Sequence, residues 1–124
     1  MNVVDSCGWL EYFADGPNAD FFAAAIEATE ELVVPSISLY EVFKRVSQQR
    51  GGGSAMRAVA VMQQGRVAAI DAPAALSAAR ISLDLGLPMA DSLMLATARA
   101  NDAIFWTQDA DFADVPEVNY IARR

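Results

Sequence analysis

Short apolar segments alternate with longer helical segments along almost the whole chain. Apolar runs of strand length lie at residues 2–5, 32–35, 67–70, 103–107 and 118–121, and segments with helical periodicity separate most of them. Strands that alternate with helices pair in parallel, because each helix returns the chain to the same end of the sheet. The pattern therefore predicts an α/β fold. We expect a three-layer α/β/α sandwich with a central, mainly parallel sheet of four or five strands.

The predicted helices lie at residues 6–14, 19–31, 38–50, 54–64, 73–85 and 90–100. Gly51-Gly52-Gly53 is predicted to be a turn between two of them, since three glycines supply any backbone angle that a turn needs. The chain has 124 residues, no internal repeat and no linker. We therefore expect a single domain over residues 1–124.

The absence of histidine restricts the chemistry most. The chain has no histidine and one cysteine, Cys7. These counts exclude Ser-His-Asp and Cys-His catalytic sites and nearly every structural zinc site. Catalysis would have to rest on carboxylates, hydroxyls, amides or a hard metal ion. Cys7 is predicted to be a small buried residue beside the end of a strand.

The sequence also indicates where the protein acts. No apolar run approaches the roughly 20 residues that span a membrane. Asp5 and Glu11 stand where a signal peptide would carry basic residues, so we expect a cytoplasmic protein without a membrane partner. The net charge of −7 argues against passive nucleic-acid binding, which depends on Lys and Arg.

Acidic residues stand where predicted strands end and predicted helices begin. Asp71 ends the third strand, and Asp5 follows the first. Asp109 and Asp111 follow the fourth strand. Glu41 and Asp91 lie in the first turns of predicted helices. In a parallel sheet the carboxyl ends of the strands share one edge, where ligands bind. Each acid also has a structural explanation. Ser38 and Glu41 would form a capping box, and Asp5 or Asp91 would cap a helix or complement its dipole.

Asp5, Glu41, Asp91 and Asp109 are far apart in sequence, yet the predicted fold would bring them to one edge. Four carboxylates at one place repel one another unless a cation that prefers oxygen ligands lies between them. Mg²⁺ or Mn²⁺ fits this description. Such an ion lowers the pKa of bound water and stabilises negative charge on a phosphodiester, so nucleic acid can be hydrolysed without histidine.

Four segments of the chain resemble PIN-domain ribonucleases, specifically the VapC-type toxins of type II toxin–antitoxin systems. They are VVDSCGWLEYF, LYEVFK, PMADSLMLATARA and WTQDADF, and they span nearly the whole chain. The resemblance implies a catalytic, metal-binding set with two supporting polar residues: Asp5, Glu41, Asp91 and Asp109, with Ser6 and Thr107. Asp111 also fits the last segment, and Asp109 is preferred because it is nearer the strand end. Asp71 matches no segment and is predicted to begin a helix with Pro73.

The resemblance also implies an activity and partners. The protein would be an Mg²⁺-dependent endoribonuclease, in which a metal-activated water attacks the phosphorus and leaves a 5′-phosphate and a 3′-hydroxyl. A cognate antitoxin would inhibit it, and it would form a homodimer. Two alternatives remain at this stage. One is a PIN-like module that binds RNA or protein without cutting, and the other is a phosphoacceptor receiver module. The receiver is disfavoured because the only lysine, Lys44, does not follow the last core strand.

Basic residues gather in the middle of the chain. No acid lies between Val42 and Ile70, while five of the nine basic residues do: Lys44, Arg45, Arg50, Arg57 and Arg66. The first four of these flank the glycine turn. They either solubilise an exposed helical hairpin or guide RNA phosphates toward the acidic site. The apolar sides of the hairpin are an alternative partner surface, made of Leu39, Phe43, Val59 and Met62.

Overall fold

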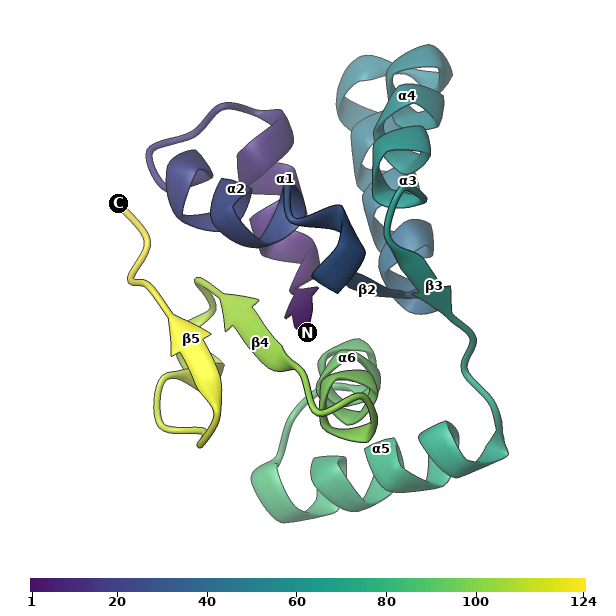
Figure 1. Cartoon of the computed structure of the whole chain (residues 1–124), viewed down its shortest axis with the longest axis vertical. Helices are drawn as coiled ribbons and strands as arrows, with labels where there is room; N and C mark the ends of the chain where they lie inside the picture. Colours follow the sequence, from purple (N-terminus) through teal and green to yellow (C-terminus); the bar gives the residue numbers. More distant parts are fainter.

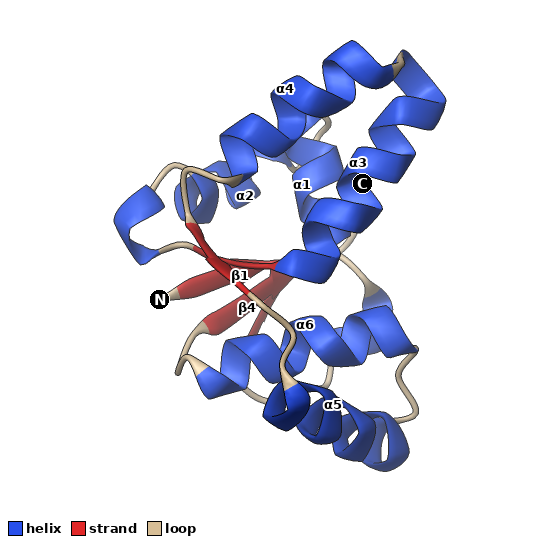
Figure 2. Cartoon of the chain, turned by 90° about the vertical axis from the view of Figure 1, so that its right-hand side faces the viewer, coloured by secondary structure: helices blue, strands red, loops and turns tan.

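A parallel sheet separates two layers of helices in the computed structural model, which describes all 124 residues (Figure 2). The strands are β1 (Asn2–Val4), β2 (Val33–Pro35), β3 (Arg66–Ala68), β4 (Ile104–Thr107) and β5 (Val118–Tyr120). β1, β4 and β5 pair side by side, β2 pairs with β3, and a bridge between Asn2 and Leu32 joins the two groups. Every pairing is parallel, in the order β3-β2-β1-β4-β5. The predicted α/β/α sandwich is confirmed.

The helices divide unequally between the two faces of the sheet (Figure 1). One face carries α1 (Ser6–Phe13), α2 (Ala19–Ile26), α3 (Ser36–Arg50) and α4 (Gly52–Met62), and the other carries α5 (Ala72–Leu85) and α6 (Met89–Ala100). Two short 3₁₀ turns complete the chain, η1 (Thr29–Glu31) and η2 (Ala110–Phe112). None of these helices has the length and hydropathy needed to span a membrane.

Neighbouring residues on a strand point to opposite faces, and this alternation builds two hydrophobic cores. Val4 and Val34 lie in the core beneath α1–α4, together with the fully buried Trp9. Val3 and Val33 lie in the core beneath α5 and α6. The strands can therefore be apolar throughout, as expected for a sheet that is covered on both sides.

Several predicted boundaries are wrong, and the reasons are local. The segment predicted as one helix over residues 19–31 ends at Ile26 and continues as η1, and the strand predicted at residues 67–70 lies at 66–68. The predicted three-glycine turn is shorter in the structure, because only Gly51 separates α3 from α4. Gly51 has φ +89°, a backbone angle that favours glycine. The other two glycines begin α4. Asp71 does not end a strand. It caps α5, and its Oδ1 accepts a hydrogen bond from the backbone N–H of Ala74 at 3.0 Å.

Candidate metal centre

Three carboxylates from distant parts of the sequence meet at the carboxyl ends of β1 and β4. Asp5 directly follows β1, Asp109 lies two residues beyond the end of β4, and Asp91 is in the first turn of α6. One oxygen atom from each lies within 4.8 Å of the other two. β1 and β4 are adjacent in the sheet, so their ends bring two of the acids together, and α6 packs against both strands and supplies the third.

Asp5 is held in place by side chains rather than by a helix cap. Its side chain is 3% exposed. It occupies the N-cap position of α1 but accepts no capping hydrogen bond there, so the capping explanation for Asp5 is wrong. Instead its Oδ2 accepts hydrogen bonds from Thr107 Oγ1 at 2.7 Å and from Cys7 Sγ at 3.3 Å. These contacts fix the carboxylate at the end of β1.

Thr107 connects Asp5 to Asp109. Its hydroxyl donates to Asp5 and accepts a hydrogen bond from the backbone N–H of Asp109 at 2.9 Å. Asp109 Oδ1 in turn accepts from the backbone N–H of Asp111 at 2.9 Å. The side chain of Asp111 is exposed, and Asp109 is the member of this pair that contributes an oxygen to the cluster of three.

Glu41 lies at the border of the cluster. α3 begins at Ser36, so Glu41 is in the second helical turn and not in the first as predicted. Ser6 Oγ donates a 2.8 Å hydrogen bond to Glu41 Oε1 and so links the start of α1 to α3. The capping box with Ser38 does not form: α3 has no side-chain cap, and the hydroxyl of Ser38 is buried without a partner.

The electrostatics of the cluster are those of crowded carboxylates. Burial raises the pKa of Asp5 above its usual range, and the charges of Asp109 and Glu41 add to this effect. The pKa of Asp91 is raised to about 7, first by burial and then by its acidic neighbours Asp5, Asp109, Glu41 and Asp111. The charges that act on Asp91 are all negative. Such a group of carboxylates is stabilised when a cation binds between them.

The donor set fits a hard divalent cation. The ligand atoms are carboxylate oxygens, and no histidine is present. Mg²⁺ and Mn²⁺ prefer such oxygens and are usually bound through one or two carboxylates together with water and substrate phosphate. Asp5, Asp91 and Asp109 would supply the carboxylate ligands. Glu41 is close enough that its charge raises the pKa of Asp5 and of Asp91.

Two supporting contacts were not predicted from the sequence. Cys7 does more than fill space, because it donates a hydrogen bond to Asp5; burial also raises the pKa of its thiol to about 12, which keeps it protonated. Gln108, buried between Thr107 and Asp109, accepts a hydrogen bond from Asn18 Nδ2 at 2.9 Å. Asn18 also binds the carbonyl of Ala122 near the C-terminus. The sequence has no signal that links these segments.

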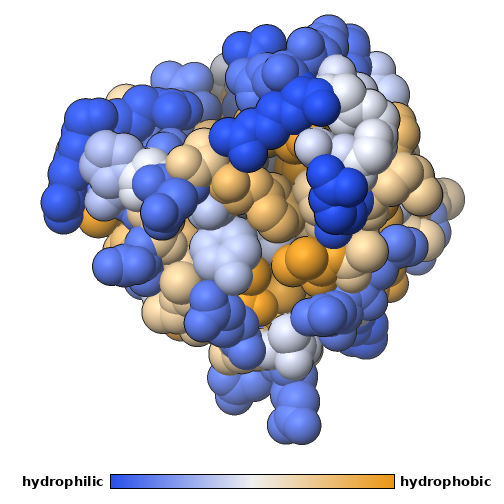
Figure 3. Space-filling view, turned by 90° about the horizontal axis from the view of Figure 1, so that it is seen from above, coloured by the Kyte–Doolittle hydropathy of each residue, from blue (hydrophilic) through white to orange (hydrophobic).

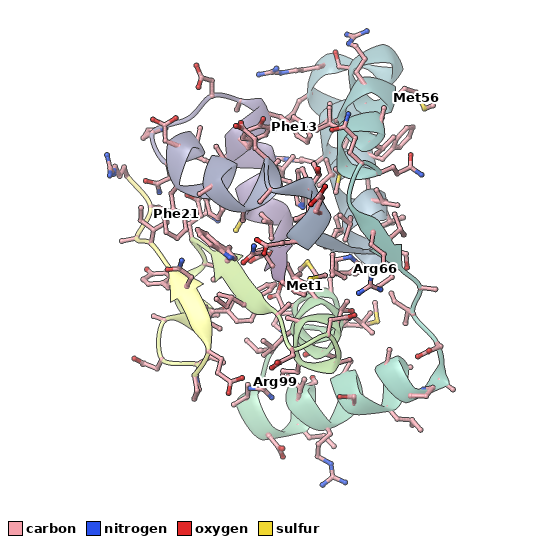
Figure 4. The ribbon with its side chains drawn as sticks, viewed as in Figure 1. Met1, Phe13, Phe21, Met56, Arg66 and Arg99 are labelled. Carbon is pink, nitrogen blue, oxygen red and sulfur yellow. The ribbon has the colours of Figure 1, made fainter.

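The basic residues divide into two groups on the α3–α4 hairpin. Lys44 and Arg45 line a hollow beside Glu41. Arg50 and Arg57 instead border a cavity of about 280 Å³ between α1 and the hairpin. Phe13 points from α1 toward the hairpin and lines this cavity (Figure 4). Seen from above, this side of the molecule has an apolar hollow surrounded by hydrophilic side chains (Figure 3).

The hairpin also has an exposed apolar surface. Leu39, Phe43 and Val59 line a hollow together with Met56, which lies on the outer side of α4 (Figure 4). Met62 was predicted to belong to this surface, and that prediction is wrong because Met62 is fully buried in the core. The reason is its position at the end of α4, where the helix returns to the sheet.

The fold and the carboxylate cluster define a class of protein: an α/β domain with a candidate metal site at the carboxyl ends of parallel strands. The family model of the PIN domain matches residues 3–118. The chain therefore belongs to the PIN domain family. A phosphoacceptor receiver module, one of the alternatives from sequence, is excluded by this assignment. No curated protein matches the sequence significantly.

Solved structures show the same fold over nearly the whole chain. A toxin–antitoxin complex from Klebsiella pneumoniae matches with a TM-score of 0.81 at 19% identity, covering 95% of both chains. VapC20 from Mycobacterium tuberculosis, described as a toxin that cleaves the sarcin-ricin loop, matches with a TM-score of 0.79 at 17% identity, covering 96% of this chain and 98% of that one. DNA-bound VapBC from Salmonella typhimurium matches with a TM-score of 0.74 at 14% identity, covering 98% and 97%.

Proposed function

We propose that the protein is a metal-dependent endoribonuclease and the toxin of a toxin–antitoxin pair, acting in the cytoplasm. The observation that carries the proposal is the cluster of Asp5, Asp91 and Asp109, whose oxygens lie within 4.8 Å of one another in a PIN domain. The relatives of similar fold include toxins and toxin–antitoxin complexes. Their identities to this chain are low, so the proposal depends on the site as well as on the fold.

In the proposed mechanism, these three carboxylates would hold one or two Mg²⁺ ions. An ion held there would lower the pKa of a bound water molecule and neutralise charge on the phosphodiester. Thr107 fixes Asp5 and the Asp109 backbone, so that the ligands keep their positions when RNA binds. Ser6 holds Glu41 at the border of the cluster, from where its carboxylate would complete the predicted set of four metal-binding acids. Cleavage leaves a 5′-phosphate and a 3′-hydroxyl.

Lys44 and Arg45 support an RNA substrate, because they are the cations beside an acidic site that would otherwise repel phosphates. Arg50 and Arg57 lie farther along the hairpin, where they border an apolar cavity. A cognate antitoxin and a second copy of the chain both require apolar surface. The cavity at α1 and the exposed hollow of Leu39, Phe43 and Val59 supply it.

The test is RNA cleavage by three variants that each convert one aspartate to asparagine. Asp5→Asn and Asp91→Asn should abolish Mg²⁺-dependent cleavage of total RNA while the far-ultraviolet circular dichroism stays that of a folded protein. Asp71→Asn is the matched control, because Asp71 is an exposed aspartate that caps α5 outside the cluster. It should cleave like the wild type. Wild-type activity in the first two variants would refute the site, and a wild type that binds RNA without cutting it would favour the non-catalytic alternative.

A further inference from the structure

The hollow beside Glu41 is open and has a mixed chemical character. It has a volume of about 310 Å³, in the lower range for small-ligand pockets. Leu10 of α1 forms an apolar part of its wall. The polar and aromatic lining comes from Ser6 at the start of α1 and from α3: Tyr40, Glu41, Lys44, Arg45 and Gln48. The carboxylate cluster borders only the Ser6–Glu41 end of this hollow. The other residues of the hollow make no hydrogen bond to the clustered acids.

Tyr40 is the aromatic side chain of the hollow, and the core does not need it. It is 60% exposed although it lies on a helix that buries its other face. The ammonium of Lys44 lies 5.8 Å from the centre of its ring, a cation–π contact that keeps a positive charge beside the ring. A large exposed ring accompanied by a cation is suited to stacking with a nucleobase, because every base has an apolar face and a phosphate close to it.

The polar residues of the hollow complement a nucleotide. Lys44 and Arg45 supply positive charge for phosphate, and the amide of Gln48 can both donate and accept a hydrogen bond at a base edge. The end of the hollow away from Gln48 borders the carboxylate cluster, where Ser6 donates a 2.8 Å hydrogen bond to Glu41. An RNA strand whose phosphate lies at the cluster would therefore place a neighbouring nucleotide in this hollow.

We propose that the hollow binds one unpaired nucleobase next to the scissile phosphate, stacked on Tyr40. The inference rests on the proposed ribonuclease function and adds to it a residue that would hold a base beside the cleavage site. A base in a duplex is stacked between its neighbours and does not offer a free face to Tyr40. Lys44 and Arg45 attract the strand by charge, whereas Tyr40 recognises that a base is present.

The test compares two probes that differ only in their bases. Hexauridylate and a ribose-phosphate hexamer without bases are bound to the full-length protein in EDTA, where no cleavage occurs, at several salt concentrations. The wild type should bind hexauridylate more tightly. Tyr40→Ala should weaken hexauridylate binding roughly 10-fold or more, the effect expected of one stacked base, and leave binding of the abasic probe and the salt dependence unchanged. Tyr40→Phe retains the ring and should bind like the wild type.

Leu83→Ala is the matched control, because Leu83 is 83% exposed and lies on α5, on the opposite face of the sheet from this hollow (Figure 1). Equal binding of the two probes by the wild type, or equal loss of both probes in Tyr40→Ala, would overturn the proposal and leave the hollow to another partner, such as a protein. The cleavage test with Asp5→Asn is independent of this result. An inactive Asp5→Asn variant together with no base dependence would refute the base site and leave the ribonuclease proposal intact.

Discussion

Replacing Asp91 by asparagine should stabilise the metal-free protein at neutral and alkaline pH. The folded protein raises the pKa of this carboxyl from 3.8 to about 7, because the group is partly buried among other acids. The folded state therefore holds a proton that the unfolded chain releases. The free energy of unfolding therefore falls as pH rises from about 4 to about 7, because in that range the native state binds more protons than the unfolded state.

The size of the effect follows from the same pKa. A rise from 3.8 to about 7 corresponds to about 4 kcal/mol at roughly 1.4 kcal/mol per pKa unit. Asp91 is only half-buried, so solvent screening reduces this to about 2 kcal/mol. Removing the charge also loses about 0.5 kcal/mol of attraction to the N-terminus of α6. The expected gain is therefore about 1.5 kcal/mol, or about 6 °C in Tm for a domain of this size.

The assay is urea unfolding followed by tryptophan fluorescence at pH 4 and pH 8 in EDTA, because Trp9 is fully buried in the folded protein. Asp91→Asn should be more stable than the wild type at pH 8, and this advantage should shrink as the pH falls and be lost near pH 4, the pKa of the carboxyl in the unfolded chain. Asp5 has a raised pKa as well, so the variant keeps part of the pH dependence. Asp84→Asn, an exposed acid on α5, is the control. Parallel pH profiles for wild type and Asp91→Asn would refute the reasoning.

Three further predictions concern support of the site, charge and packing. Thr107→Val removes a hydrogen bond to the buried carboxylate and should weaken Mg²⁺ affinity about 10-fold, measured by calorimetric titration; unchanged affinity would contradict the role of the hydroxyl. Neutralising Lys44, Arg45 and Arg50 together should weaken RNA binding and reduce its salt dependence, and an unchanged salt slope with unchanged cleavage would exclude these residues as the RNA approach. Gly8→Ala would place a methyl group 2.6 Å from the ring of Phe22 in α2. This overpacking should lower the free energy of unfolding, measured in urea, by about 1–3 kcal/mol. Wild-type stability would show that α1 and α2 separate easily.

The layer architecture was predictable from sequence because it follows from periodicity. Apolar strands that alternate with amphipathic helices have few arrangements other than a parallel sheet covered on both faces, and the structure has this arrangement. Boundaries were less predictable, since they depend on tertiary contacts. Strand β3 ends at Ala68, although the apolar residues that predicted it continue to Ile70. The residues after the strand lead into α5, which Asp71 caps.

The meeting of the acids was predictable to the extent that it follows from topology. Asp5 and Asp109 follow adjacent parallel strands, so their positions in sequence indicate the same edge. The surrounding hydrogen bonds were not predictable, because they depend on how side chains pack in three dimensions. The thiol of Cys7 reaches Asp5, and Asn18 reaches Gln108 across 90 residues of sequence. Neither residue type has a preferred partner that a single sequence would indicate.

The central claim is that the clustered carboxylates bind a divalent cation. The most direct measurement is an anomalous difference map from a crystal of the protein soaked in MnCl₂. We expect a manganese peak between the carboxylates of Asp5, Asp91 and Asp109, within about 2.0–2.4 Å of their oxygens. A well-diffracting crystal that shows no peak there at millimolar Mn²⁺, or shows manganese only at other acids, would contradict it.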